Sequence, residues 1–180
     1  SNSPRRRELL AGLDIDYRVT ALPEVDESYP DTLSGEEIPL YISQEKAAAY
    51  RRFMKDNTLL ITADTIVWLD GKVYGKPRDI ADAKAMLQAL SGKTHTVITG
   101  VTLTSLQKQI SFAVSTEVTF AALGDDEIDY YVETYRPLDK AGAYGVQEWI
   151  GYIGVTGLKG SYYNVMGLPI QRLYTELKKF

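Results

Sequence analysis

The sequence of 180 residues contains no cysteine and only one histidine, His95. Without cysteine the chain has no disulfide, no thiolate nucleophile, no iron–sulfur cluster and no cysteine-bound zinc. A single imidazole excludes a metal site built from several histidines, and no serine–aspartate arrangement of the triad type points to His95, which we interpret as structural. Chemistry in this chain must therefore depend on carboxylates, lysines, arginines, hydroxyls and amides.

Positive charge is not in excess, since 20 lysines and arginines stand against 24 aspartates and glutamates, a formal net charge of −4. Such a chain has no general attraction for nucleic acid or an anionic membrane, and an anionic ligand needs a local cluster of cations. The longest apolar stretch, residues 59–69, contains Asp64 and is half as long as the ~20 residues that cross a bilayer. We expect a cytoplasmic protein with no membrane span, no secretory signal and no nucleic-acid partner.

Periodicity and turn residues predict an α/β domain. We expect helices after Ser3-Pro4 and over residues 39–54, 80–90, 125–135 and 169–180. We expect strands over residues 15–21, 58–69, 72–75, 94–106, 110–123 and 152–158. An acidic loop from Pro23 to Glu37 and a glycine-rich loop over residues 136–149 connect them. No repeat or linker divides the chain, so we expect a single domain over residues 1–180 with a bent mixed β-sheet and flanking helices.

A cluster of arginines, Arg5, Arg6 and Arg7, falls in the first turn of the first helix, where positive charge opposes the helix macrodipole. The free backbone N–H groups, the Ser3 hydroxyl and the guanidinium groups could together bind a phosphate. Because successive helical residues are ~100° apart, Arg6 and its neighbour Arg5 are the candidates, whereas Arg7 faces solvent. A solvated basic face is the alternative interpretation.

Asp64 interrupts an apolar strand, where an unpaired carboxylate is costly to bury. Buried carboxylates are paired, capped or metal-bound, and Glu27 and Asp26 of the acidic loop could join Asp64 at a hard cation such as Mg²⁺. The alternatives are an aspartate at a strand bulge that hydrogen-bonds Thr65, and an acidic loop that is merely solvated.

Three more polar residues lie in suggestive surroundings: Lys46 in an alanine-rich helix, Lys76 in Gly-Lys-Pro after a hairpin, and Gln147 in the glycine-rich loop. An amide offers a donor and an acceptor, and so could read the edge of a nucleobase. Ordinary surface lysines and a plain loop glutamine remain equally open. The sequence has neither of the two common glycine-rich nucleotide fingerprints.

A set of short motifs follows one order along the chain: SNSPRRRELL, VDES, QEKA, ITADTIV, YGKPRD, LSGKTHTVITGV, STEVTF, PLDKAGAYGVQ and GSYYNVMGLP. From Ser1 to about Pro169 the chain thereby resembles the Maf family of nucleoside triphosphate pyrophosphatases. The pieces S-P-R-R, A-D-T and Y-G-x-Q resemble the branch of that family acting on dTTP and UTP. The resemblance implies a fold similar to that of inosine triphosphatases, with two lobes around a cleft, and a homodimer.

The resemblance also implies hydrolysis between the α and β phosphates, with a divalent cation, Mg²⁺ or Mn²⁺. Asp64 would be the proton acceptor and, with Glu27, a metal ligand. The residues that would bind the triphosphate are Ser3, Arg5, Arg6, Lys46 and Lys76. Those that would determine base preference are Arg5, Thr65 and Gln147.

Two features differ from the family pattern. Family members begin with a hydrophobic strand before the S-x-S-P motif, and we expect this N-terminal strand to be missing here. Glu148-Trp149 follows Gln147 where a Gly-Leu pair is common. Two other functions remain in view: a nucleotide-binding regulator of septum formation that acts through a protein partner, and a nucleic-acid-binding basic helix that only the three arginines favour.

Overall fold

The structure is a computed structural model that describes residues 1–21 and 24–180. The chain divides into two compact units. Unit 1 comprises residues 1–65, 98–114 and 167–180, and unit 2 comprises residues 66–97 and 115–166. The predicted α/β class is confirmed, because helices and one sheet make up both units.

The described residues form a five-stranded sheet in the order β2-β1-β3-β4-β5. The strands are β1 (Leu60–Leu69), β2 (Lys72–Tyr74), β3 (Thr94–Thr104), β4 (Gln109–Phe120) and β5 (Val155–Lys159). The sheet is antiparallel, so the prediction of a mixed sheet is wrong. Two of its connections, at residues 70–71 and 105–108, are too short for the crossover that a parallel pair needs.

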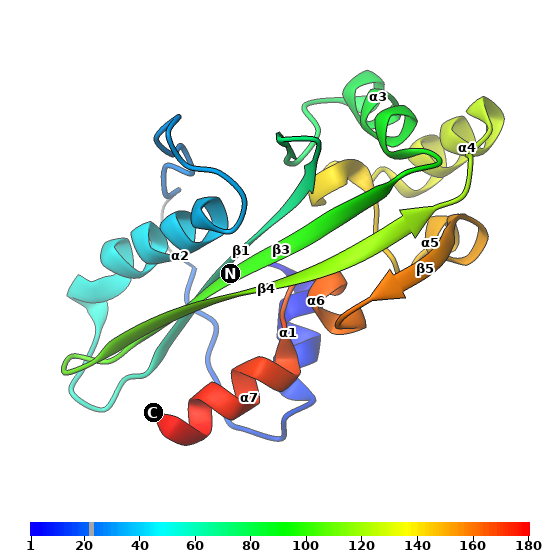
Figure 1. The fold of residues 1–180 in the computed structure, drawn as a ribbon. Coiled ribbons are helices and arrows are strands. Elements are labelled where there is room, and N and C mark those ends of the chain that lie inside the picture. Colours follow the sequence, from blue (N-terminus) through cyan, green and yellow to red (C-terminus); the bar gives the residue numbers. More distant parts are fainter. Residues whose placement is uncertain (22–23) are drawn as a thin grey trace. The chain divides into compact units, whose positions relative to one another are not determined.

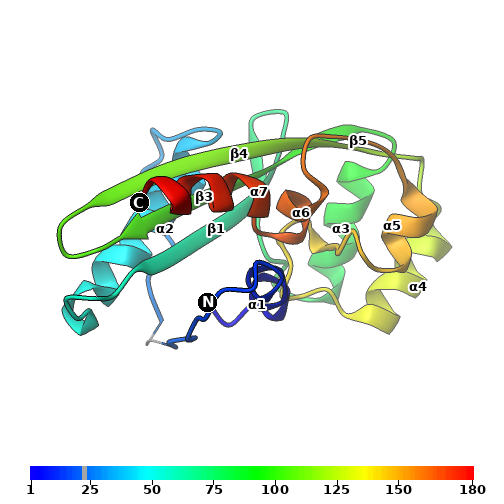
Figure 2. The ribbon, with the colours of Figure 1, turned by 90° about the horizontal axis from the view of Figure 1, so that it is seen from below.

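In unit 1, helices cover both faces of the sheet (Figure 1). These helices are α1 (Pro4–Ala11), α2 (Glu37–Tyr50), the short 3₁₀ turn η1 (Arg51–Phe53) and α7 (Ile170–Lys179). One face carries the apolar core of the unit, which gathers Ala63, Val101, Leu103, Phe112, Leu168 and Leu173, with Leu9 and Leu10 of α1 packed against it. Figure 2 shows α7 running beside the β3–β4 hairpin, where Arg172 lies over the Phe112 ring.

The opposite face of the sheet in unit 1 is covered by α2, which approaches β3 unusually closely. A Cβ atom on Gly100 would lie only 2.4 Å from the Pro39 carbonyl carbon and 2.5 Å from the Leu40 nitrogen. Thr62 of β1 donates a hydrogen bond to the Ser43 carbonyl at 2.7 Å, and the Ser43 hydroxyl lies 2.7 Å from that of Thr102. These contacts fix α2 against the sheet.

Unit 2 packs helices α3 (Ile80–Leu90), α4 (Asp125–Tyr135), α5 (Trp149–Gly154) and α6 (Tyr162–Met166), with the 3₁₀ turn η2 (Ala141–Ala143), around a larger core. Asp79 caps α3 by accepting a hydrogen bond from the Asp82 backbone nitrogen at 2.8 Å. His95 is buried, its Nε2 lies 2.6 Å from the Tyr144 hydroxyl, and burial lowers its pKa to about 4. A buried neutral imidazole in an aromatic contact agrees with a structural role.

Two local predictions are wrong, and one helix was missed. Residues 15–21 form no strand, because Ile15 and Tyr17 have no sheet face to pack on and stay 39% and 42% exposed. Residues 152–154 belong to α5 rather than to a strand, and the helix α6 was not predicted. The predicted acidic loop begins at Pro23, outside the described residues; residues 24–36 form no helix or strand.

No helix in the described part of the chain is long and apolar enough to cross a membrane.

Candidate active site

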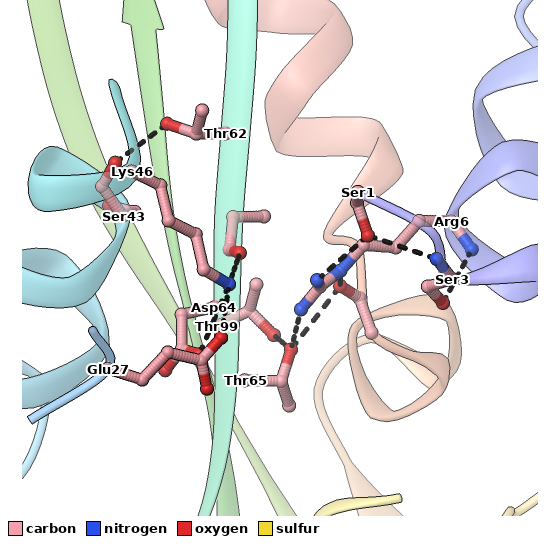
Figure 3. A network of polar contacts seen from close by, with 12 residues as sticks. Ser1, Ser3, Arg6, Glu27, Ser43, Lys46, Thr62, Asp64, Thr65 and Thr99 are labelled. Carbon is pink, nitrogen blue, oxygen red and sulfur yellow. Dashed lines mark hydrogen bonds and ion pairs between the residues drawn. The ribbon is translucent and has the colours of Figure 1, made fainter. Parts of the chain in front are cut away.

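A lysine and two carboxylates meet beside β1 in unit 1 (Figure 3). Lys46 reaches from α2, and its Nζ lies 3.6 Å from Asp64 Oδ1 and 3.2 Å from Glu27 Oε1. The same Nζ donates a hydrogen bond to the Ala63 carbonyl at 3.0 Å. Because side chains alternate along a strand, Asp64 faces α2 whereas Thr65 faces α1. The ammonium group thus joins two acidic side chains that lie 37 residues apart in the sequence.

Asp64 is buried, with 8% of its surface exposed, and burial raises the pKa of its carboxyl to about 6. The positive charges of Lys46 and Arg6 act against this rise, and the negative charge of Glu27 adds to it. Oδ2 of Asp64 is buried and has no hydrogen-bond partner among the described residues. A carboxyl with this pKa and an unused oxygen can accept a proton near neutral pH.

The carboxylate oxygens near Lys46 also fit, in part, the ligands of a hard divalent cation. Asp64 Oδ2 and the half-exposed Glu27 are carboxylate donors of the kind that Mg²⁺ prefers alongside several water molecules. Among the residues that the structure describes, no three histidine, cysteine or acidic side chains gather as a metal site. Asp26 faces its own loop, where the Ser28 backbone donates to it at 2.9 Å and lowers its pKa.

Arg6 extends from α1 on the other side of β1 (Figure 3). Its Nε donates to the Gly167 carbonyl at 2.8 Å, and its Nη2 donates to the Thr65 hydroxyl at 3.0 Å. Burial lowers the pKa of the guanidinium, and the charge of Asp64 acts in the opposite direction. Ser3 is the N-cap of α1, and its hydroxyl accepts a hydrogen bond from the Arg6 backbone nitrogen at 3.4 Å. Arg7 is exposed, as predicted.

Two of the predicted site residues, Lys76 and Gln147, belong to unit 2. Lys76 is exposed in the turn before α3. Gln147 lies in a tight turn, closed by a hydrogen bond of 3.0 Å from the Glu148 nitrogen to the Gly145 carbonyl. The Tyr131 hydroxyl accepts from the Gly145 nitrogen at 3.0 Å and donates to Glu148 Oε1 at 2.6 Å. The Gln147 Oε1 atom is buried without a hydrogen-bond partner among the described residues.

Comparison with known proteins shows the family to which this chain belongs. The family model described as "Maf-like protein" matches residues 1–180. The chain belongs to the Maf family. It is 68% identical over 179 residues to a protein of Phocaeicola vulgatus named dTTP/UTP pyrophosphatase, covering 99% of this chain and 93% of that protein. Proteins with the same name from Bacteroides thetaiotaomicron and Porphyromonas gingivalis are 64% and 56% identical, covering 99% and 100% of this chain and 93% and 92% of theirs.

In this Maf chain unit 1 gathers most of the residues that the sequence predicted for the site. Ser3, Arg5 and Arg6 come from α1, Glu27 from the loop before α2, Lys46 from α2, and Asp64 and Thr65 from β1. Sequence reasoning missed two residues that contact them, Thr99 and Gly167. Gly167 lies in the Maf motif GSYYNVMGLP, which could have identified it as a site residue. Thr99 lies in a strand with several other threonines, and no local pattern distinguishes it.

Proposed function

We propose that this Maf chain is a dTTP/UTP pyrophosphatase, which hydrolyses the bond between the α and β phosphates and releases a nucleoside monophosphate and pyrophosphate. The observation that carries the proposal is Asp64, a buried carboxyl of pKa about 6 whose Oδ2 has no partner among the described residues. Three relatives at 56–68% identity bear that name, and they support the choice of substrate.

Asp64 is the proton acceptor in this proposal. At neutral pH a carboxyl of pKa about 6 is mostly ionised, yet it is basic enough to take a proton from an attacking water molecule. Its position supports the role, because Lys46 engages Oδ1 at 3.6 Å and leaves Oδ2 for the water. The apolar strand around Asp64 keeps competing solvent away from the carboxylate.

The triphosphate is bound by cations from several elements. Phosphoryl transfer depends mainly on positioning and on neutralising charge in the transition state, which guanidinium and ammonium groups supply. We assign this role to Arg5, Arg6, Lys46 and Lys76, and we assign a hydrogen bond to the phosphates to the Ser3 hydroxyl. A fold like that of inosine triphosphatases is part of the same proposal, and within it we assign Lys76 and Gln147 of unit 2 to the substrate.

A divalent cation, Mg²⁺ or Mn²⁺, is the cofactor that we propose, with Asp64 and Glu27 as its protein ligands. When bound, such a cation neutralises phosphate charge and orients the oxygens of the triphosphate. The convergence of both carboxylates on one positive group, Lys46 Nζ, supports a cation at this place. A homodimeric state and a cytoplasmic location also belong to the proposal and rest on the family resemblance alone.

Gln147 is the residue that we propose to read the base. Uracil and thymine present an acceptor, an N–H donor and a second acceptor, and a side-chain amide complements one acceptor together with the N–H. The buried Oε1 of Gln147, which lacks a partner among the described residues, suits that N–H. Arg5 and Thr65 complete the set that the sequence predicts for base preference.

The test is a hydrolysis panel of dTTP, UTP, CTP, ATP and 7-methyl-GTP with Mg²⁺ or Mn²⁺, with both products identified. A buried polar group without its partner loses roughly 1–3 kcal/mol, so we expect dTTP and UTP to exceed the others at least tenfold in kcat/KM. Gln147→Ala should narrow this preference, whereas Gln171→Ala, an exposed glutamine of α7, should leave it unchanged. Equal turnover of dTTP and 7-methyl-GTP, or release of orthophosphate instead of pyrophosphate, would contradict the proposal.

A further inference from the structure

The turn that carries Gln147 is tied at both ends to one buried hydroxyl. A hydrogen bond of 3.0 Å from the Glu148 nitrogen to the Gly145 carbonyl makes residues 145–148 a β-turn, with Gln147 at its third position. The Tyr131 hydroxyl accepts from the Gly145 nitrogen at 3.0 Å and donates to Glu148 Oε1 at 2.6 Å. The first and the last residue of the turn therefore meet at the same oxygen atom, which α4 supplies.

Tyr131 is a fixed support for this contact. Its side chain is fully buried on α4, and its ring stacks on that of Tyr135 with 5.2 Å between the ring centroids. Burial and the hydrogen bond to Glu148 raise the pKa of the Tyr131 hydroxyl, so it stays a hydrogen-bond donor at neutral pH. A hydroxyl that both donates and accepts inside a packed core can hold two partners in one geometry.

Glu148 is engaged through both of its carboxylate oxygens. Oε1 accepts from Tyr131, and Oε2 lies 3.8 Å from the Nζ of Lys140, a buried lysine that also donates to Asp139 Oδ1 at 3.1 Å. Glu148 directly precedes α5, yet its side chain caps no backbone N–H of that helix among the described residues. The carboxylate is therefore turned inward, where it fixes the end of the turn.

Two glycines leave the space that this arrangement needs. A Cβ on Gly145 would lie 2.8 Å from Glu148 Oε1 and 3.0 Å from Lys140 Cε, in the place that these side chains occupy. A Cβ on Gly151 of α5 would overlap the carbonyl oxygen of Val146. The backbone of the turn is thus packed against a carboxylate at one end and against a helix at the other, which leaves it little freedom to move.

From these contacts we infer that Tyr131 and Glu148 are positioning residues for base preference, which act by holding the turn that presents Gln147. The inference rests on the proposed function in taking Gln147 as the residue that reads the base. Gln147 Oε1 is buried and has no partner among the described residues, so the backbone of the turn determines where this atom can meet a base. Hydrogen bonds weaken steeply when their angle changes. Loosening the turn therefore weakens recognition of the base without weakening the binding of the phosphates.

The first test compares dTTP with CTP. Tyr131→Phe keeps the buried ring but leaves the Gly145 amide and the Glu148 carboxylate without their shared partner. We expect it to lower the ratio of kcat/KM for dTTP to that for CTP roughly fivefold or more, the loss typical of an unsatisfied buried group. Glu148→Ala should lower the ratio similarly. Glu148→Gln still offers an oxygen to Tyr131 and should keep most of the preference.

Two variants of α4 serve as matched controls. Tyr130→Phe removes a neighbouring, half-exposed hydroxyl and keeps the ring that lies 4.8 Å from Trp149. Glu133→Ala removes a carboxylate that pairs with Lys84 at 2.8 Å. Both controls should keep the wild-type ratio. Inorganic triphosphate, which has no base, should bind to wild type, to Tyr131→Phe and to Glu148→Ala equally well. Weaker binding of inorganic triphosphate to the last two variants would overturn the inference.

A double-mutant cycle tests whether Tyr131 acts through Gln147. Because Gln147→Ala removes the amide, adding Tyr131→Phe to it should lower the dTTP-to-CTP ratio no further. Losses that add in the double variant, or a wild-type ratio in both Tyr131→Phe and Glu148→Ala, would overturn the inference.

Amide hydrogen exchange measures the stability of the turn without any substrate. The Gly145 and Glu148 amides should exchange roughly tenfold faster in Tyr131→Phe than in wild type, and unchanged exchange would overturn the inference. A wild type that hydrolyses dTTP no better than CTP would instead contradict the proposed function. Exchange at these two amides would still decide whether Tyr131 holds the turn.

Discussion

Burial of the ionised Asp64 carboxylate in the strand is energetically unfavourable. Its pKa rises from 3.8 to about 6, mainly because the carboxylate loses water, and the nearby charges of Lys46 and Arg6 recover only part of the loss. The rise corresponds to about 3 kcal/mol of destabilisation when the carboxylate is ionised. A cost of this size at a single buried side chain is typical of a group retained for chemistry rather than for stability.

Asp64→Asn should therefore stabilise the protein in a pH-dependent way. Between pH 4 and pH 6 the unfolded chain has lost the Asp64 proton while the folded chain keeps it, so this group makes the wild type less stable as the pH rises. Asparagine has no such proton. The stability of Asp64→Asn relative to wild type should rise across this window, reach about 3 kcal/mol above pH 6, and then stay constant.

Urea unfolding of both proteins at pH 4.5, 5.5 and 7 in the presence of a chelator measures this difference. His95 also titrates abnormally, but it is the same in both proteins and cancels in the comparison. A difference that does not change with pH, or a variant less stable than the wild type at pH 7, would contradict the burial cost assigned to Asp64.

Individual residues show which parts of the candidate site the sequence could predict and which it could not. The burial of Asp64 beside a positive partner was predictable, because a charge inside an apolar run has few explanations other than a partner or a function. Gln147 was singled out by its glycine-rich loop and by the family motif. Thr99 was not predictable, because its importance comes only from the Thr65 hydroxyl that lies 2.8 Å away on the neighbouring strand.

At the scale of elements, the docking of α2 on the sheet sets the position of Lys46. The helix reaches the sheet closely because Gly100 has no side chain, and because Thr62 and Ser43 hydrogen-bond across the gap at 2.7 Å. Lys46 lies one turn further along α2, and from there its Nζ reaches Asp64. A shift of the helix by a fraction of an ångström therefore moves the ammonium relative to the carboxylate.

Gly100→Ala is the substitution that tests this dependence. The new Cβ would meet backbone atoms of Pro39 and Leu40 at 2.4–2.5 Å, which cannot move independently of α2. We expect a loss of roughly 1–3 kcal/mol in the free energy of unfolding and a fall of at least tenfold in kcat for dTTP. Gly157→Ala is the control, since its nearest neighbour, a Thr119 side-chain atom, lies at an ordinary 3.9 Å. A Gly100→Ala protein with unchanged stability and kcat would contradict the role of α2.

Long periodic elements were predictable, and so was the three-residue β2, whereas the short helices α5 and α6 were not. The predictions for α3 and α4 match the structure because apolar residues recur at helical spacing along their whole length, and Asp79 caps α3. The strand predicted over residues 15–21 failed because alternation without a neighbouring strand is not enough to form a sheet. The five-residue helix α6 is too short for periodicity to distinguish it from a loop.

At the scale of the whole molecule, the site in unit 1 is assembled from distant parts of the chain. The contact between Arg6 and Gly167 joins residues 161 positions apart, and the one between Lys46 and Ala63 joins residues 17 apart. Composition and periodicity cannot foresee such pairs. The ordered family motifs contain all four of these residues, although motifs in a sequence do not show which residues are in contact.

The most direct test of the account is the pH dependence of kcat/KM for pyrophosphate release from dTTP, measured from pH 5 to pH 8 in wild type and Asp64→Asn. The value for wild type should rise with pH as Asp64 loses its proton and should then level off; because a bound cation favours the ionised carboxylate, the midpoint of this rise should lie at or below the pKa of about 6 of the metal-free chain. Asp64→Asn should still bind dTTP but lose activity by 10²–10⁴-fold, the range typical of a missing general base. A wild-type profile without this rise, together with an Asp64→Asn protein that keeps more than about a tenth of the activity, would contradict Asp64 as the proton acceptor.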